Sequence, residues 1–212
     1  MPEALTHLLD TPQLLALAAA LGWASGFRLY AAVFITGIAG YMGWIALPTG
    51  LQVLQHPAVL SASGFMLFIE FFADKIPLVD SLWDMVHTVI RIPAGAALAA
   101  GALGADSSTM GWVAAILGGT LAATSHATKM TTRAAVNTSP EPFSNVLVSL
   151  FEDGLVVGAL WLATTHPVIF GIALCLVLAL MVLLLVVLFR FLKVVATGIS
   201  RFFSGAKAPQ GT

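Results

Sequence analysis

The sequence predicts an all-α integral membrane protein, a polytopic helix bundle in which some helices are broken or re-entrant. Hydrophobic residues make up 59% of the 212 residues and charged residues only 9%, against roughly 45–50% and 25% in ordinary soluble domains. The mean hydropathy of +0.97 agrees with this. Nine basic and ten acidic side chains could not cover the surface of a soluble domain of this size, so we expect the chain to lie in a lipid bilayer.

The same composition excludes soluble enzymes, disordered chains and secreted disulfide scaffolds. A net charge of −1 offers no basic surface to phosphates, so no nucleic-acid partner is expected. The single cysteine, Cys175, can form neither an internal disulfide nor a multi-cysteine metal site. Residues 1–10 form a polar lead without Lys or Arg. Because a signal peptide needs a basic start, none is expected there.

The first apolar stretch, residues 14–47, would be about 50 Å long as one helix, which is too long for a hydrocarbon core of roughly 30 Å. We therefore predict a short leading segment, a break near Ser25-Gly26 and a spanning helix from about 27 to 47. Residues 58–72 are apolar but short. They run into charge and proline at 73–77, which favours a half-membrane segment.

The rest of the chain is predicted to hold longer helices joined by polar or proline-rich connections. A helix is expected from 78 to 103, with a kink at Pro93, and the helices that follow it are 110–137, 143–165 and 167–195. Their connections are residues 104–108 and 139–142, and Glu152-Asp153-Gly154 is expected to interrupt the helix 143–165. In total, residues 1–212 are expected to form one membrane domain with about five to seven membrane segments.

The C-terminal tail, residues 196–212, is expected to be cytoplasmic, as part of a protein of the bacterial inner membrane. The last helix and the tail carry basic residues and no acid: Arg190, Lys193, Arg201 and Lys207. Basic residues concentrate on the cytoplasmic side of membrane proteins.

A weak similarity between two parts of the sequence favours a transporter built from repeats. Asp74 precedes His87 by the same interval as Asp153 precedes His166, within similar local sequences. Two halves that each contain a broken, charged segment are typical of repeat-based transporters. The alternative is chance similarity between repetitive apolar stretches.

Charged residues inside or at the edges of the apolar segments are the main functional signal. They are the acids Glu70, Asp74, Asp80, Asp84, Glu141, Glu152 and Asp153, and the bases Arg28, Lys75, Arg91, Lys129 and Arg133. Placing one such charge at the bilayer centre costs roughly 2.5–3.5 kcal/mol. These side chains must therefore face one another, a watery cavity or the interface, and their near-equal numbers suit mutual pairing.

Two polar stripes sharpen this expectation. One stripe leans acidic and the other basic, and both follow helical spacing: Asp80, Asp84, His87 and Arg91, and His126, Lys129, Arg133 and Asn137. Lipid cannot solvate either stripe, so the two faces are expected to be buried against each other or around water.

Three interpretations compete for this polar centre. It could be an ion-pair network that fixes helix register, a path or binding site for a hydrophilic species, or the site of an intramembrane enzyme. The acid–histidine neighbours Asp84 and His87 could transfer protons. None of the common hydrolase or metalloprotease motifs is present, however, so an enzyme is the less favoured interpretation.

The favoured hypothesis assigns each group of residues a role. Arg28, Lys129 and Arg133 would hold an anionic group. Carboxylates would bind a cation or carry protons: Glu70, Asp74, Glu152 and Asp153. The acidic stripe would switch between pairings, with His87 titrating near neutral pH. No cofactor is predicted. A cation at the carboxylates, or a transition metal at His87 or His126, is left open because Lys75 competes as a counter-ion.

The charged motifs resemble those of the domain-of-unknown-function family 4126. The resemblance covers about residues 14–165. Its motifs are Ser25–Leu29; Phe72–Pro77 followed by Asp80, Asp84, Val86–Thr88, Arg91 and Pro93–Ala96; Ser125–Lys129 with Arg133; and Asn145–Asp153. It implies a multi-pass membrane protein of bacterial or plastid type and no particular activity. The family's motif positions coincide with the charges described above and add Asn145 to the candidate site.

We therefore predict a transport protein, a channel, carrier or flippase that moves an ion or a small polar or anionic group through a buried charged site. Its expected partners are the lipid bilayer and a small ion, polar solute or lipid headgroup. Helices rich in Gly and Ala, such as residues 101–119, permit self-association into a homo-oligomer. The alternatives are an intramembrane lipid-processing enzyme and a non-catalytic assembly or scaffold protein.

Overall fold

A computed structural model describes residues 9–76, 78–104, 109–138 and 142–203, and this part of the chain consists of helices joined by short connections. The elements, in chain order, are α1 (Thr11–Tyr41), the 3-10 helix η1 (Thr49–Gln55), α2 (Pro57–Ala73), α3 (Val79–Ala102), α4 (Thr109–Val136), α5 (Pro142–Thr165) and α6 (Pro167–Phe203). Glu141, most of the expected loop 104–108, most of the connection 139–142 and the ends of the chain lie outside the described residues.

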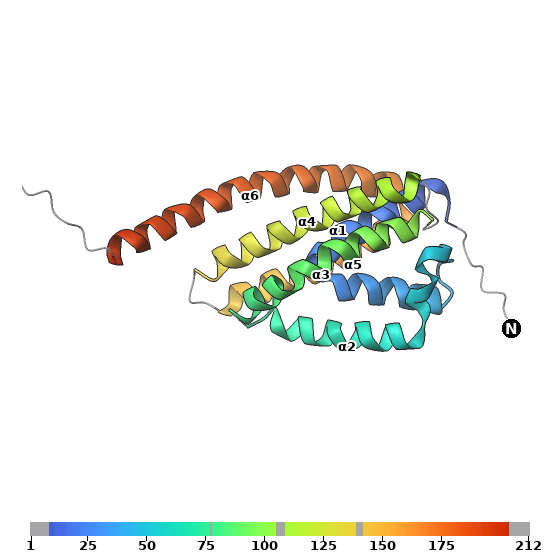
Figure 1. Ribbon diagram of the computed structural model, residues 1–212, viewed down its shortest axis with the longest axis horizontal. Coiled ribbons are helices and arrows are strands. Elements are labelled where there is room, and N and C mark those ends of the chain that lie inside the picture. Colours follow the sequence, from blue (N-terminus) through green and yellow to red (C-terminus); the bar gives the residue numbers. More distant parts are fainter. Residues whose placement is uncertain (1–8, 77, 105–108, 139–141, 204–212) are drawn as a thin grey trace, which may run out of the picture.

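Helix α1 begins at a capping box, in which Asp10 accepts from the Gln13 backbone and the Gln13 side chain accepts in return. Arg28 then leaves the helical conformation (φ −144°, ψ 74°), and the chain turns back on itself (Figure 1). Consistent with this reversal, Leu17 of the first limb lines the same cavity as Ile35 and Ala39 of the second limb. Helix α1 is therefore a re-entrant hairpin with Arg28 at its tip.

This reversal corrects the predicted spanning helix over 27–47. The helix ends at Tyr41, so the second limb is only about 20 Å long, too short for a hydrocarbon core of roughly 30 Å. The break that the sequence predicted near Ser25-Gly26 is present, and it lies at Arg28. Gly26 is needed for packing instead, because a Cβ there would lie 1.9 Å from Ser125 Oγ of α4.

Helix α2 is the short segment that the sequence predicted, and it meets η1 at an angle of 69°. It ends at Ala73, and α3 begins at Val79. Between them Leu78 adopts a positive φ of 71°, which is a strained conformation for a bulky side chain. Helix α3 then continues unbroken through Pro93.

Helix α5 corrects a second prediction, because Glu152-Asp153-Gly154 does not interrupt it. Both carboxylates form ion pairs with basic side chains of other helices, so the bundle stabilises them within a continuous helix. Helix α6 has 37 residues and extends past the end of α4 (Figure 1). Its apolar surface is largely exposed, as expected for a helix that faces lipid.

The described chain is built as an integral membrane protein. By length and apolar composition four of its helices could cross a membrane, or five if the bent pair η1 and α2 forms one span. Helix α1 is one of the four, although its chain turns back at Arg28. Helix α4 is not among them, which agrees with the polar second half that its sequence predicted. The internal repeat stays a prediction, because Asp74 follows the end of α2 whereas Asp153 lies within α5.

Candidate functional site: a buried ion-pair network

The reversal of α1 and the end of α2 meet the charged faces of α3, α4 and α5. This brings together nine charged side chains, which we call the ion network: Arg28, Glu70, Asp74, Asp84, Arg91, Lys129, Arg133, Glu152 and Asp153. All except Asp153, whose side chain is 26% exposed, are almost completely buried. Lipid could not solvate these charges, so the charged side chains of one helix must be solvated by the polar groups of the others.

Asp74 lies at the centre of the ion network. Its Oδ2 is 2.6 Å from Arg28 Nη1, 2.6 Å from Lys129 Nζ and 4.0 Å from Arg133 Nη2. Asp74 is also the residue that caps the C-terminus of α2. One carboxylate oxygen at a helix end is therefore surrounded by three cations from two other helices.

Arg91 organises the side of the ion network nearest α3. It contacts the Glu70 carboxylate and lies 2.9 Å from Asp84 Oδ1. Its Nη1 is also 3.4 Å from His126 Nδ1, and the other ring nitrogen of His126 is 2.7 Å from Thr88 Oγ1. The predicted acidic and basic stripes thus meet through Arg91 and His126.

Arg133 organises the opposite side, towards α5. Its Nη2 lies 2.6 Å from Glu152 Oε2. Its Nη1 donates to two backbone carbonyls, those of Asp74 and Asn145. Arg133 thereby ties the end of α2 to α5.

Backbone carbonyls at the two helix ends are part of the site. The last turn of a helix leaves carbonyl groups without intrahelical partners, and these carry partial negative charge. At the α1 break, Gly26 O accepts from Arg91 and Phe27 O accepts from Lys129. At the end of α2, Asp74 O accepts from Arg133. The basic side chains therefore solvate helix ends as well as carboxylates.

The pairing is close but incomplete. Within the ion network five carboxylates face four basic side chains. Among the described residues, Asp74 Oδ1, Glu70 Oε2 and Asp84 Oδ2 are buried without a hydrogen-bond partner. Such oxygens retain the capacity to accept a hydrogen bond or a proton.

Lys75 lies beside the ion network rather than inside it. Its Nζ donates to Phe71 O and to Ser149 Oγ and sits over the Phe71 ring. Lys75 thus lies at the margin of the site, held between α2 and α5.

Two members of the predicted acidic stripe lie apart from the ion network. Asp80 is buried, and its carboxylate accepts from Asn137 Nδ2 and from the Ser81 backbone. His87 stacks on Trp83 and hydrogen-bonds to Tyr30. Only Asp84 and Arg91 of that stripe pair with each other, so one switching network made of all four residues does not form.

Sequence reasoning missed Ser149. Its side chain and carbonyl both accept from Arg28, and its hydroxyl also accepts from Lys75. Asn145, Ser149 and Glu152 follow helical i, i+4, i+7 spacing, which places them on one face of a helix. That spacing was a usable signal.

The described residues contain no group of three His, Cys, Asp or Glu side chains arranged to hold one metal ion. The carboxylates considered as ligands, Glu70 and Asp74, face Arg91, Arg28 and Lys129 instead. Basic side chains are therefore their counter-ions in this structure.

Comparison with known proteins places the chain in a family. A family model described as Domain of unknown function (DUF4126) matches residues 15–187. No curated protein and no solved structure matches the chain significantly. The matched region includes the whole ion network, and the chain belongs to this family.

Proposed function

We propose that this member of the DUF4126 family is a membrane transport protein that passes a small oxyanion, or a lipid headgroup that carries one, through the ion network. The observation that carries the proposal is the environment of Asp74, where a carboxylate at the end of a half-membrane helix sits among Arg28, Lys129 and Arg133. Guanidinium and ammonium groups in this arrangement are the donors that proteins use for oxyanions.

In this proposal Asp74 is an internal substitute for the transported anion. When α2 moves away from α1 and α4, the Asp74 carboxylate leaves and an incoming oxyanion takes its contacts. The exchange keeps the cations neutralised, which matters because an uncompensated buried charge is costly.

The chain between α2 and α3 supplies a place for that movement. Leu78, at a positive φ of 71°, separates the two helices and is strained. Helix α2 packs mainly against α1 and only lightly against α3. Broken helices that end at a charged mid-membrane site are also the architecture of many transporters.

A scaffold role is the competing hypothesis, because the same pairs could simply lock five helices together. A buried ion pair contributes little net stability compared with apolar packing, so a purely structural network is an expensive way to fix the bundle. The incomplete pairing of Asp74 Oδ1 and Glu70 Oε2 favours a site that changes partners.

The test is flux into liposomes that contain the purified protein. One arm follows radiolabelled inorganic phosphate, and the other follows an anionic phospholipid with a labelled headgroup that starts in one leaflet. The wild-type chain should move at least one of the two probes. Asp74→Asn should lower the KM, because the internal competitor is removed.

The matched control is the double variant Asp74→Asn/Lys129→Met. It restores the charge balance of the site while removing one of the three anion-holding cations, so it should remain folded and show no flux. Melting temperatures in detergent check folding. Wild-type flux equal to that of empty liposomes would contradict transport and favour the scaffold. Unchanged flux in the double variant would contradict passage through the ion network.

The proposal includes the surroundings of the protein. We place it in the bacterial inner membrane with the C-terminus in the cytoplasm, because the end of α6 is basic. A homo-oligomer built through Gly- and Ala-rich helix faces also remains a proposal.

A further inference from the structure

A groove of about 320 Å³ lies between α4 and α6, outside the ion network. Its volume falls within the range of roughly 300–1,000 Å³ that is common for ligand sites. The described lining consists of Thr131 from α4 and four residues of α6, which are Leu185, Val186, Phe189 and Arg190. Val186 is 45% exposed and Phe189 is 69% exposed, so the groove is open to the surroundings of the bundle.

The lengths of the two helices place this groove at one edge of the membrane. Residues 167–189 of α6 carry no charge, and Arg190 is the first charged residue after them. Arg190 lies about 35 Å along α6 from Pro167, slightly more than a hydrocarbon core of roughly 30 Å. Thr131 lies about 33 Å along α4 from Thr109. Both helices therefore bring the groove to the level of the lipid headgroups.

Arg190 is a cation without a carboxylate partner in the described part of the chain. Its side chain is exposed, and none of the ion pairs among the described residues involves it. Helix α6 itself contains no acid. A guanidinium group offers a fork of N–H donors that matches the oxygens of a phosphate. The groove thus presents a free phosphate-binding group at headgroup depth.

The order of groups along the groove is that of a phospholipid. Arg190 lies at the end of the lining nearest the aqueous phase, and Leu185 lies about 8 Å closer to the membrane centre along α6. A phosphate held by Arg190 would therefore leave an acyl chain to run inward over Leu185 and Val186. Charge and apolar surface follow each other in the same sense as in the lipid.

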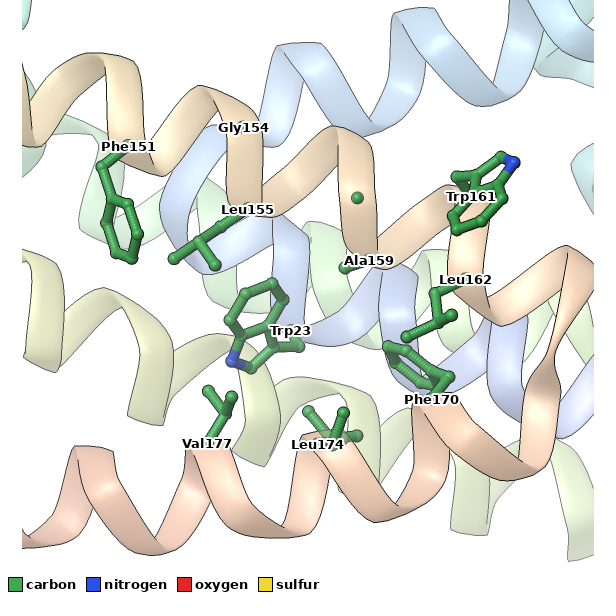
Figure 2. Close-up of a pocket in the computed structure, with 12 residues that line it drawn as sticks. Trp23, Phe151, Gly154, Leu155, Ala159, Trp161, Leu162, Phe170, Leu174 and Val177 are labelled. Atoms are coloured by element: carbon green, nitrogen blue, oxygen red, sulfur yellow. The ribbon is translucent and has the colours of Figure 1, made fainter.

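The larger cavity between α5 and α6 lacks this combination. It has a volume of about 400 Å³, and its walls are apolar side chains around the Trp23 indole (Figure 2). All of its described lining residues are uncharged. It has no group to hold a phosphate, whereas the groove beside Arg190 has one.

We propose that the groove between α4 and α6 binds one anionic phospholipid, with a phosphate oxygen accepting from the Arg190 guanidinium and an acyl chain over Leu185 and Val186. Basic pockets between membrane helices bind the headgroups of anionic lipids. A zwitterionic headgroup carries its own cation, which would compete with Arg190 for the phosphate. This binding goes beyond the proposed transport, because no ion-network side chain lines the groove.

The test is thermal unfolding of the delipidated protein in a neutral detergent as lipid is added. Phosphatidylglycerol should raise the melting temperature by roughly 5 °C at concentrations far above its Kd, because it binds the folded chain alone. Phosphatidylcholine with the same acyl chains should raise the melting temperature much less. Inorganic phosphate should not raise it, because it has no chain to fill the apolar part of the groove.

Two pairs of variants provide the controls. Arg190→Gln should abolish the rise, whereas Lys193→Gln should keep it, because Lys193 is an exposed cation of α6 outside the groove lining. Val186→Trp fills the groove, keeps Arg190 and should also abolish the rise. Val187→Trp should keep it, because Val187 is 53% exposed and lies outside the lining.

Four results would overturn the proposal. They are no rise with phosphatidylglycerol, an equal rise with phosphatidylcholine, a rise that survives Arg190→Gln or Val186→Trp, and a loss that is as large in Lys193→Gln as in Arg190→Gln. The last result would indicate attraction by the overall charge of α6. A rise with inorganic phosphate alone would assign Arg190 to a free anion and also contradict a lipid site. None of these measurements depends on flux, so failure here and failure of the transport assay are distinguishable.

Discussion

A guanidinium group in a bilayer interior must find its solvation within the protein, and Arg133 finds it in three places. It contacts the Glu152 carboxylate and the carbonyls of Asp74 and Asn145. Breaking a buried pair leaves the partner charge uncompensated, which costs about 3–5 kcal/mol. The ion network is therefore sensitive to loss of single members and tolerant of balanced replacement.

This sensitivity gives a prediction for Arg133. Arg133→Met should lower the melting temperature in detergent strongly, because Glu152 loses its closest cation. Arg133→Met/Glu152→Met should lower it by less than the two single changes combined. The control is Arg190→Met, which alters an exposed side chain of α6. Equal melting temperatures for Arg133→Met and Arg190→Met would show that the pair contributes nothing to stability.

At the same scale, the sequence predicts which charged residues are buried but not which of them form ion pairs with each other. The expectation that Arg28, Asp74 and Lys129 meet follows from the cost of solvating charges in lipid. The separation of Asp80 and His87 from Arg91 could not be predicted, because helical spacing gives the face of a helix but not what lies opposite each turn. Asn137 and Tyr30 occupy those positions.

At the scale of elements, close helix packing depends on glycines where α1, α3 and α4 cross. A Cβ at Gly22 would lie 2.7 Å from the Gly118 Cα, and a Cβ at Gly118 would lie 2.3 Å from the Ala99 Cβ. Small residues let helix backbones approach closely in membranes. The contact between Gly22 and Gly118 positions the first limb of α1, and hence Arg28, against α4.

Gly22→Ala should therefore lower the melting temperature, because the added methyl group meets backbone that cannot move aside. Gly158→Ala is the matched change, since the new Cβ would meet open space, and it should leave the melting temperature nearly unchanged. Thermal unfolding of the two variants in one detergent compares them. A Gly22→Ala chain as stable as Gly158→Ala would mean that the helices do not cross as described.

Helix boundaries were largely predictable from apolar runs and prolines, and the exceptions have physical causes. The reversal of α1 occurs at a single residue, Arg28, whose conformation is held by partners from α2 and α5. The Glu152-Asp153-Gly154 sequence predicts a helix break only if the two carboxylates lack counter-ions. In the structure Arg133 pairs with Glu152, and Arg28 pairs with Asp153. Both errors arise because local sequence does not contain the distant cations and carboxylates.

At the scale of the whole molecule, the re-entrant α1 decides where the charges lie. If α1 crossed the membrane once, its two ends would lie on opposite faces and Arg28 would be an isolated charge in a long helix. Because the chain turns back, Gln13 reaches the Thr164 carbonyl at the end of α5, and Trp44 lines a cavity with Thr164 and Thr165. The ion network is a consequence of this topology.

Accessibility of single cysteines from the two sides of a sealed vesicle tests this topology most directly. In a Cys175→Ala background, cysteine replaces Thr11, Met42 or Thr138, which are all exposed. We predict that a membrane-impermeant maleimide labels positions 11 and 42 from the same side and position 138 from the opposite side. Labelling of positions 11 and 42 from opposite sides would make α1 a simple span, remove Arg28 from the reach of Asp74 and Asp153, and contradict the account.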